Sequence, residues 1–282
     1  MLMFFASFIV RKLEMVPEIN SRFEVRLAKN EEEVLQAQKL RYEVFVREFG
    51  AKVSVSNDEL KLDRDPFDQF CKHLILVDKE CFNENSKVPV VGTIRLLEAN
   101  VAKNNLGFYS AGEYNLNSIY EMKKRSLEIG RACVHKKYRK NIALLMLWKG
   151  LGKFVIKRNI KVLFGVASFH GIDASKFSSA LSLLYHRYRA PNELNFKAHR
   201  NGYLNMNIIP EHEIELGQAM SQMPNLIKAY IRLGGKVAEG GFVDNIFNTI
   251  DIGIIIDTDK MTSKYREFYE RGTRNQKNGK LQ

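Results

Sequence analysis

The pattern of hydrophobic and polar positions is most informative between Ser126 and Phe169. In the run Ser126–Val134, apolar residues alternate with other residues, which predicts a β-strand. From Ile142 to Lys157 the apolar residues recur at helical spacing, so a helix is expected. The short apolar run Val162–Phe169 contains β-branched residues and predicts a buried strand. Together these segments predict a βαβ unit whose two strands are parallel.

A basic loop connects the first of these strands to the helix. Its cationic side chains and the asparagine that follows them are Lys136, Lys137, Arg139, Lys140 and Asn141. A helix N-terminus binds phosphate through unpaired N–H groups and its partial positive charge, and asparagine tolerates the left-handed conformation of a tight turn. The sequence leaves two interpretations open, a phosphate site and a solvated basic loop.

Two charged residues lie inside the first strand of this unit. Glu128 and Arg131 are an odd number of residues apart, so regular alternation places them on opposite faces of the sheet. A carboxylate within a sheet beside a phosphate site is a candidate base. The alternative is one half of a structural ion pair, which would also perturb its pKa.

The residues before this unit predict a strand, a helix and a pair of strands. Phe23–Leu27 alternates as a strand does, and Asn30 is the expected N-cap of a helix that ends near Phe49. His73–Asp78 and Val90–Leu97 predict two antiparallel strands. On the inner face of the helix, the guanidinium of residue 41 needs a carboxylate partner or lines a site.

The residues after this unit continue the alternation of elements. A helix is expected over Ser175–Tyr188, followed by a loop-rich stretch over residues 191–209. A second helix is expected within Met223–Gly234, because a proline lies near the first turn of this segment and a glycine at its end. The sequence then predicts a turn at Gly240–Asp244 and a strand at Phe247–Ile256.

Composition narrows the class of partner. The chain has 282 residues and a net charge of +12, and residues 123–161 alone contain 13 Lys or Arg against one acid. Such a focused field predicts an acidic partner: a phosphorylated cofactor, an acidic carrier protein, an anionic bilayer or nucleic acid. Nucleic acid is disfavoured because no recognised nucleic-acid-binding motif accompanies the charge. Cys71, Cys81 and Cys133 lack metal-type spacing, which indicates reduced thiols and no bound metal.

The first ten residues are almost wholly apolar. The segment is too short to span a bilayer, and no basic residues precede it as they would in a secretory signal. Two interpretations remain open, a shallow membrane anchor and a start-site choice in which Met15 is the later start. The charged tail after Tyr265 is expected to be frayed.

The motif Glu128-Ile-Gly-Arg131, the basic turn and the following helix resemble the central motif of the GNAT acyltransferase superfamily. Three further motifs, Arg41-Tyr-Glu-Val-Phe-Val, Asp65-x-x-Asp68 and Gly92-x-x-Arg95-Leu, resemble the branch of ornithine-acyl-carrier-protein N-acyltransferases, often called hemolysin-like. Acyl-homoserine-lactone synthases are a near relation. The resemblance covers residues 23–265.

The resemblance implies a GNAT-like α/β (α+β) fold. Its sheet is mixed, mostly antiparallel and twisted, with a central βαβ unit and flanking helices. Residues 1–22 are then an apolar N-terminal extension and residues 23–190 the acyltransferase core. Residues 191–265 form a C-terminal extension packed on the core, and residues 266–282 a charged tail.

The resemblance also implies the site. Glu128 is the expected catalytic base. The expected substrate-binding residues, which with Glu128 form a charged set able to pair within the protein, are Arg41, Asp65, Asp68, Arg95 and Arg131. The expected acyl-donor residues are Phe45, Val134, Arg139, Lys140, Asn141 and Ala143. Many GNAT enzymes have glycine where this chain has Asn141 and Ala143, which favours a carrier-protein donor over coenzyme A. In the C-terminal half, Asp244, Asn248 and Asp251 either cap turns or line the amine pocket.

The implied reaction moves a (3-hydroxy)acyl group from acyl carrier protein to the α-amino group of ornithine, giving a lyso-ornithine lipid. The thioester would lie between the two parallel strands, with N–H groups near Ala132–Val134 polarising its carbonyl. No permanently bound cofactor is expected. The expected location is the cytoplasm, with peripheral contact to the anionic inner membrane face. The alternatives are an acyl-homoserine-lactone synthase and a non-catalytic, membrane-associated hemolysin-like protein.

Overall fold

The computed structural model of the chain describes residues 22–81, 89–139 and 143–260. The predicted βαβ unit is present as strand β5 (Ser126–Val134), helix α7 (Ala143–Arg158) and strand β6 (Val162–His170). β5 and β6 are parallel, and their register pairs Ser126–Glu128 with Val162–Phe164. The helical spacing of the apolar residues in α7 therefore produced the crossover that parallel strands need.

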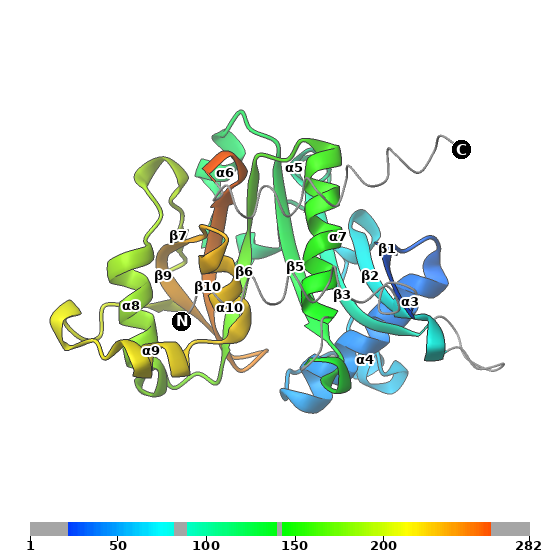
Figure 1. Cartoon of the computed structure of the whole chain (residues 1–282), viewed down its shortest axis with the longest axis horizontal. Coiled ribbons are helices and arrows are strands. Elements are labelled where there is room, and N and C mark those ends of the chain that lie inside the picture. Colours follow the sequence, from blue (N-terminus) through cyan, green and yellow to red (C-terminus); the bar gives the residue numbers. More distant parts are fainter. Residues whose placement is uncertain (1–21, 82–88, 140–142, 261–282) are drawn as a thin grey trace.

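One sheet holds the described part of the chain together (Figure 1). Its order is β1-β2-β3-β5-β6-β10-β9-β7-β4, and β8 pairs with β9. Neighbours are antiparallel except in the pairs β5–β6 and β7–β9. The remaining strands are β1 (Phe23–Leu27), β2 (Lys72–Asp78), β3 (Val90–Glu98), β4 (Tyr114–Asn115), β7 (Lys197–Ala198), β8 (Tyr203–Leu204), β9 (Lys236–Asp244) and β10 (Thr249–Asp257).

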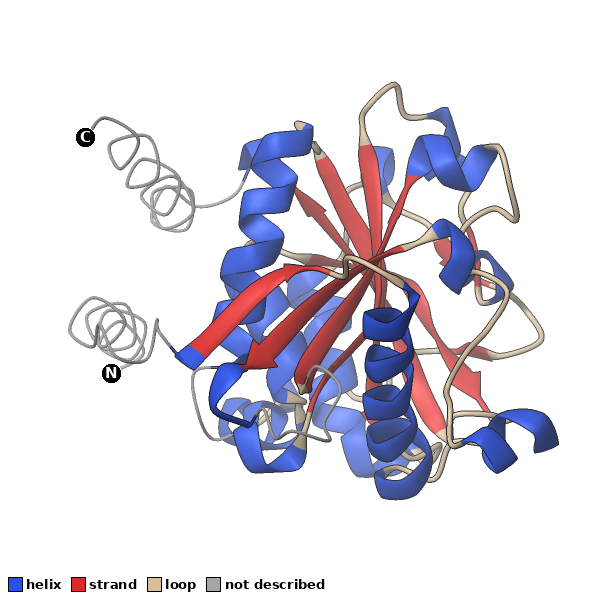
Figure 2. Ribbon diagram, turned by 90° about the vertical axis from the view of Figure 1, so that its right-hand side faces the viewer, coloured by secondary structure: helices blue, strands red, loops and turns tan. Residues whose placement is uncertain are grey.

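Helices lie on both sides of the twisted sheet (Figure 2). Alternate residues of β2 show why two layers are needed: Leu74 and Leu76 join the main core under α7, whereas Ile75 and Val77 pack against Ala37 of α3. The mixed, mostly antiparallel sheet with flanking helices confirms the predicted fold class. The other α-helices among the described residues are α3 (Glu31–Arg41), α4 (Val55–Leu60), α5 (Ala99–Lys103), α6 (Asn117–Glu121), α8 (Ser178–Tyr188), α9 (Leu216–Gln222) and α10 (Asn225–Arg232).

Helix α3 begins where the sequence predicted. The Asn30 side chain accepts the backbone N–H of Glu33 at 3.0 Å, as an N-cap does. The carboxylate of Glu33 does not return to Asn30 but accepts the N–H of Lys29 at 2.7 Å. After α3 the chain continues as a π-helix, η1 (Tyr42–Glu48), so the helical segment ends one residue before the predicted Phe49.

The predicted turn at Gly240–Asp244 is wrong, because these residues form the second half of β9. The glycines mark a bulge instead: Gly240 has a φ of 78°, and the register of β9 with β10 shifts between Ile252 and Ile254. The chain reverses after Asp244, and Asn248 takes the left-handed conformation with a φ of 54°. Isolated glycines in a sequence do not distinguish a bulge from a turn.

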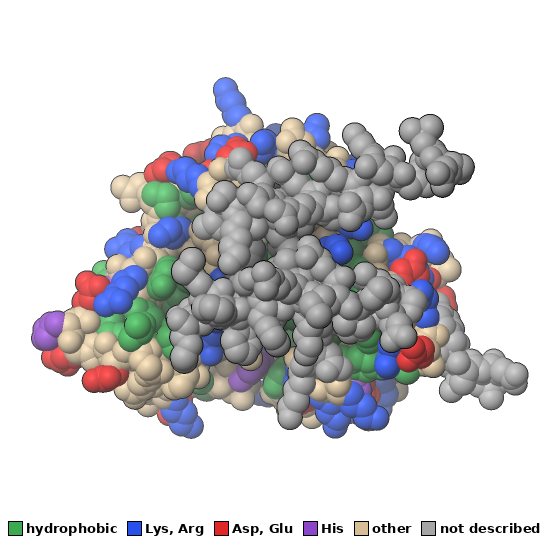
Figure 3. All heavy atoms as spheres, viewed as in Figure 1, with side chains coloured by type: hydrophobic (Ala, Val, Ile, Leu, Met, Phe, Trp, Pro, Cys, Tyr) green, Lys and Arg blue, Asp and Glu red, His purple; other side chains and the backbone are tan. Residues whose placement is uncertain are grey.

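Acidic residues from other parts of the chain fold onto the basic segment 123–161. On the face shown in Figure 3, Lys and Arg side chains are accordingly interspersed with acidic and hydrophobic ones. The charge excess of the segment is thus partly neutralised by tertiary contacts. These ion pairs include Lys124–Asp257 at 3.1 Å, Lys161–Asp259 at 2.9 Å and Arg158–Glu98 at 3.8 Å.

The apolar N-terminal segment and the charged tail after Tyr265 both lie outside the described residues. Within the described residues, no helix combines the length and the apolar character needed to cross a bilayer. None of the three cysteines forms a disulfide.

The strands β5 and β6 separate after their short paired segment. Gly165 lies at this point with a φ of 155°, and a Cβ built there would lie 2.2 Å from the carbonyl oxygen of Ile129. Only glycine permits this close approach of the two backbones. The divergence of the central strands therefore depends on Gly165.

Replacing Gly165 by alanine should lower the free energy of unfolding by about 2 kcal/mol or more, because the new Cβ meets backbone that cannot move aside. Denaturant unfolding of the purified variant measures this loss. Gly217→Ala in α9 is the matched control, since nothing lies within 4 Å of its added Cβ. The control should be neutral or stabilising by about 0.5 kcal/mol. Equal midpoints for the two variants would contradict this account of Gly165.

Candidate active site

A cavity of about 340 Å³ lies between β5 and β6 where they have separated. Its walls come from Gly130–Val134 of β5 and Val166–Ser168 of β6, with Phe45 of η1 and Tyr230 of α10 also in contact with it. The volume suits a small-molecule site. Polar lining residues from several elements accompany the apolar ones, and they include Tyr109, Glu113, Arg131, Arg139, Ser168, His170, Asn225, Asp244, Thr249 and Asp251.

Behind one wall of the cavity lies a buried network of charged side chains. Arg41 is fully buried; its Nε donates to Asp63 Oδ2 and its Nη1 to Asp68 Oδ1, both at 2.8 Å. Although burial opposes ionisation, Arg41 and Arg95 hold the pKa of Asp68 well below its usual range. Three arginines and three aspartates form the network: Arg41, Asp63, Asp65, Asp68, Arg95 and Arg131.

Arg131 connects this network to the cavity. Its Nη2 donates to Asp65 Oδ2 at 3.2 Å and to the Tyr109 hydroxyl at 3.1 Å. Its guanidinium also lies 4.5 Å from the ring centroid of Tyr109 and 4.7 Å from that of Phe247. Of the five predicted substrate-binding residues, Arg131 lines the cavity. The other four, Arg41, Asp65, Asp68 and Arg95, stand in the network and are not part of the cavity lining.

The prediction that Glu128 and Arg131 face opposite sides of the sheet is wrong. Arg131 has a φ of 50°, and the register of β3 with β5 shifts between Thr93 and Arg95, so β5 contains one extra residue there. The bulge reverses the alternation after Glu128. Both side chains therefore reach Tyr109, one at its backbone and the other at its hydroxyl.

Glu128 is buried, and it holds a turn rather than an arginine. Its Oε2 accepts the N–H of Tyr109 at 2.9 Å, and its Oε1 accepts the N–H and the hydroxyl of Ser110 at 2.7 and 2.5 Å. Burial raises the pKa of Glu128 against the lowering effect of the Ser110 bonds. Glu128 is absent from the cavity lining. The expected inclusion of Glu128 in the ion network is wrong, and Asp63 supplies the third acid instead.

The predicted acyl-donor residues divide into three groups. Phe45, Val134 and Arg139 line the cavity. Ala143 is buried in the core and does not belong to the lining. Lys140 and Asn141 lie outside the described residues.

Arg139 is already bound to protein groups. Its Nε donates to the carbonyl oxygen of Val134 at 2.8 Å, and its Nη2 donates to Glu48 at 2.7 Å. This ion pair lowers the pKa of Glu48. Arg139 thus joins β5 to η1 at the cavity wall, a role that the phosphate-site interpretation did not include.

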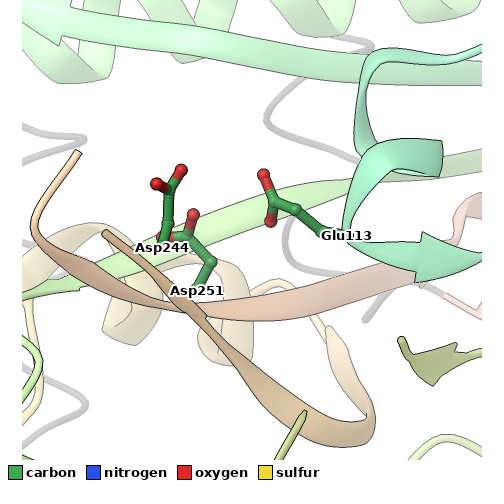
Figure 4. A group of neighbouring side chains, drawn as sticks. All are labelled: Glu113, Asp244 and Asp251. Carbon is green, nitrogen blue, oxygen red and sulfur yellow. The ribbon is translucent and has the colours of Figure 1, made fainter. Parts of the chain in front are cut away.

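Three carboxylates converge in the cavity: Glu113, Asp244 and Asp251 offer oxygens that lie within 4.8 Å of one another (Figure 4). Asp244 also caps a turn, because its Oδ1 accepts the N–H of Ile246 and of Phe247. Asp251 carried a sequence signal, a charge within an otherwise apolar strand. Glu113, Tyr109 and Phe247 carried none, since nothing in their local pattern indicates a site.

The comparisons with known proteins agree with this geometry. Residues 40–149 match the family model described as acetyltransferase (GNAT) domain. The chain is 41% identical over 249 residues to an L-ornithine N(alpha)-acyltransferase of Rhodobacter capsulatus, with 88% of this chain and 95% of that protein covered. It is 35% identical over 251 residues to a protein of the same name from Rhizobium meliloti, with 88% and 84% covered.

Solved structures of similar proteins are remote in sequence. An N-acyl amino acid synthase from uncultured soil microbes has a TM-score of 0.46 at 11% identity, with 85% of this chain and 92% of that chain covered. An acyl-homoserine-lactone synthase has a TM-score of 0.46 at 14% identity, with 84% and 90% covered. The identity and coverage of the sequence relatives decide the family. The chain belongs to the L-ornithine N(alpha)-acyltransferases, a group of N-acyltransferase enzymes.

Proposed function

We propose that this enzyme transfers a (3-hydroxy)acyl group from a thioester to the α-amino group of ornithine. The observation that carries the proposal is the similarity to ornithine acyltransferases at 35–41% identity along 87–88% of the chain. The cavity supports it independently, because its wall combines apolar residues suited to an acyl chain with charged groups suited to an amino acid.

The reaction needs no covalent enzyme intermediate. The neutral α-amine attacks the thioester carbonyl, a C–N bond forms, the C–S bond breaks, and the thiol leaves with a proton. Backbone N–H groups near Ala132–Val134 would stabilise the developing oxyanion. Arg131 would bind the α-carboxylate, since its guanidinium lines the cavity while Asp65 and Tyr109 hold it in place. The other five network residues would then position Arg131 without touching the amino acid.

An acyl carrier protein is the proposed donor. Lys136 and Lys137 are exposed, and they lie between β5 and the cavity residue Arg139. An acidic carrier surface would meet these cations while its pantetheine arm enters the cavity. Coenzyme A carries more phosphate than the carrier arm. The absence of glycine at residues 141 and 143 therefore favours the carrier protein.

The direct test is mass spectrometry of the products of purified enzyme. The enzyme is supplied with a 3-hydroxyacyl carrier protein, or with the matching acyl-CoA, and with a panel of amino acids. We expect N-acyl ornithine as the main product and a higher rate with the carrier protein. The panel includes homoserine-type acceptors and S-adenosylmethionine, which would reveal a lactone synthase.

Acylation of another amino acid in preference to ornithine would refute the proposed acceptor while keeping the reaction class. A faster reaction with acyl-CoA would refute the proposed donor. A Lys136→Glu, Lys137→Glu variant provides a further control. It should raise the KM for the carrier protein and leave the KM for ornithine near that of the unchanged enzyme.

The assignment of Glu128 as the catalytic base remains a prediction. Because Glu128 does not line the cavity and its oxygens hold the Tyr109–Ser110 turn, a proton would reach it through water. Glu128→Gln should lower kcat by about 10²-fold or more in an enzyme that still folds, with a lower thermal unfolding midpoint because the amide NH2 faces a donor that the carboxylate accepted. Initial rates across pH and circular dichroism melting measure the two quantities.

Ser110→Ala separates the two roles of Glu128. It removes one hydrogen bond to the carboxylate but leaves the carboxylate in place. If Glu128 is the base, Ser110→Ala should change kcat much less than Glu128→Gln does. Full activity in a folded Glu128→Gln enzyme would remove the assignment.

A further inference from the structure

The three cavity carboxylates take no part in the reaction described above. They come from different elements: Glu113 follows the 3₁₀ turn η4 (Tyr109–Gly112), Asp244 ends β9 and Asp251 lies in β10. Figure 4 shows their carboxyl groups turned toward a common space. All three line the cavity. The sheet order, not their sequence spacing, brings them together.

Two of the three are buried, and each has one carboxylate oxygen without a hydrogen-bond partner, although Ser168 and Thr249 act on Asp251 through hydrogen bonds. Glu113 is 7% exposed and Asp251 is 4% exposed. Within the described residues, Glu113 Oε2 and Asp251 Oδ1 make no hydrogen bond. Buried polar atoms in proteins are rarely left without partners, so these atoms point to a missing ligand.

The negative charge of the three carboxylates is not balanced by a cation reserved for them. Arg131 is a cation that acts on Glu113 and Asp251, and its guanidinium already pairs with Asp63 and Asp65. Burial, with Asp244 nearby, raises the pKa of Asp251 to about 6, and burial also raises the pKa of Glu113. A cation bound among these oxygens would relieve both the repulsion and the desolvation.

We propose that Glu113, Asp244 and Asp251 bind the side-chain ammonium of the acceptor, so that the enzyme selects diamino acids by this second charge. The inference rests on the proposed function, in which Arg131 holds the α-carboxylate of an amino acid. The α-amine then lies between two anchors, the guanidinium at one end and the acidic group at the other. Such two-point binding orients the nucleophile toward the thioester.

An ammonium fits the group better than a divalent metal ion does. An ammonium has three N–H donors besides its carbon, and acceptors about 2.8 Å from the nitrogen lie about 4.5 Å apart. The oxygens here lie within 4.8 Å of one another. Octahedral Mg²⁺ would draw neighbouring oxygens to about 3 Å, and Ca²⁺ needs six or more oxygen ligands.

The test compares ornithine with norvaline, which has the same carbon chain without the side-chain amine. The unchanged enzyme should prefer ornithine by about 10³-fold in kcat/KM, because norvaline leaves the buried carboxylates unpaired. Asp251→Asn should cut this preference by about 10-fold or more, through loss of rate with ornithine. Glu113→Gln should reduce the preference for ornithine in the same way, and this variant provides the test if Asp251→Asn does not fold.

Asp257→Asn is the matched control. Asp257 is a buried acid on the same strand, but it pairs with Lys124 at 3.1 Å and does not line the cavity. The control should keep the full ornithine preference. If the unchanged enzyme does not acylate ornithine, the proposed function fails. If it does, and Asp251→Asn and Glu113→Gln keep the preference, the acidic ammonium site is overturned. Loss of the preference in EDTA, restored by Mg²⁺ or Ca²⁺, would overturn it in favour of a metal.

Thermal unfolding without acyl donor gives a readout independent of activity. A carboxyl group whose pKa is raised by folding stabilises the fold at low pH and loses that contribution as pH rises through its folded pKa, here about 6 for Asp251. The charged groups acting on Asp251 and Glu113 are Asp244, Arg131 and Glu128. From pH 5 to pH 8, Asp251→Asn should therefore gain about 5 °C in Tm relative to the unchanged enzyme.

Ornithine at pH 8 should raise the Tm of the unchanged enzyme, and norvaline should not. The same ornithine concentration should have little effect on Asp251→Asn. Two results together would overturn the inference. The first is a Tm difference between the unchanged enzyme and Asp251→Asn that does not change with pH, and the second is equal stabilisation of the unchanged enzyme by ornithine and norvaline.

Discussion

The left-handed bulge at Arg131 is the feature on which the site depends. A regular strand would turn this guanidinium toward the α7 side of the sheet and away from its aspartates. The extra residue in β5 turns it to the face where Asp65 and Tyr109 hold it. The positive φ of a non-glycine residue is strained, and the surrounding ion pairs offset that cost. Strain of this kind is common at functional sites, where the surrounding structure maintains it.

The cavity has a separate origin, the limited pairing of two parallel strands. β5 and β6 pair only at Ser126–Glu128, and the close approach at Gly165 ends their contact. Beyond that point the strands present their edges and side chains to the space between them. Apolar walls and a charged region then coexist in one cavity, which suits a reaction joining an acyl chain to an amino acid.

The charged residues behind the cavity act as one unit. Arg41 and Asp68 are buried in the network, so removal of either partner would leave an uncompensated charge. Such a network contributes little net stability by itself, but it restricts the geometry of the side chains it contains. Here the restricted side chain is Arg131, the member of the network that lines the cavity. The residues behind Arg131 therefore act on the cavity through its guanidinium and not by lining the cavity themselves.

Local sequence patterns were enough to predict most of the central elements and the family. Periodicity placed the βαβ unit and the paired strands β2 and β3, and Asn30 marked the start of α3, because these features depend on neighbouring residues. Tertiary structure decided what Glu128 binds, that Asp63 completes the network, and that Glu113 meets Asp251. Those contacts join residues far apart in the chain, and one bulge reversed the alternation on which the prediction for Arg131 relied. The face of the sheet on which a side chain lies depends on strand register, and only the assembled sheet determines that register.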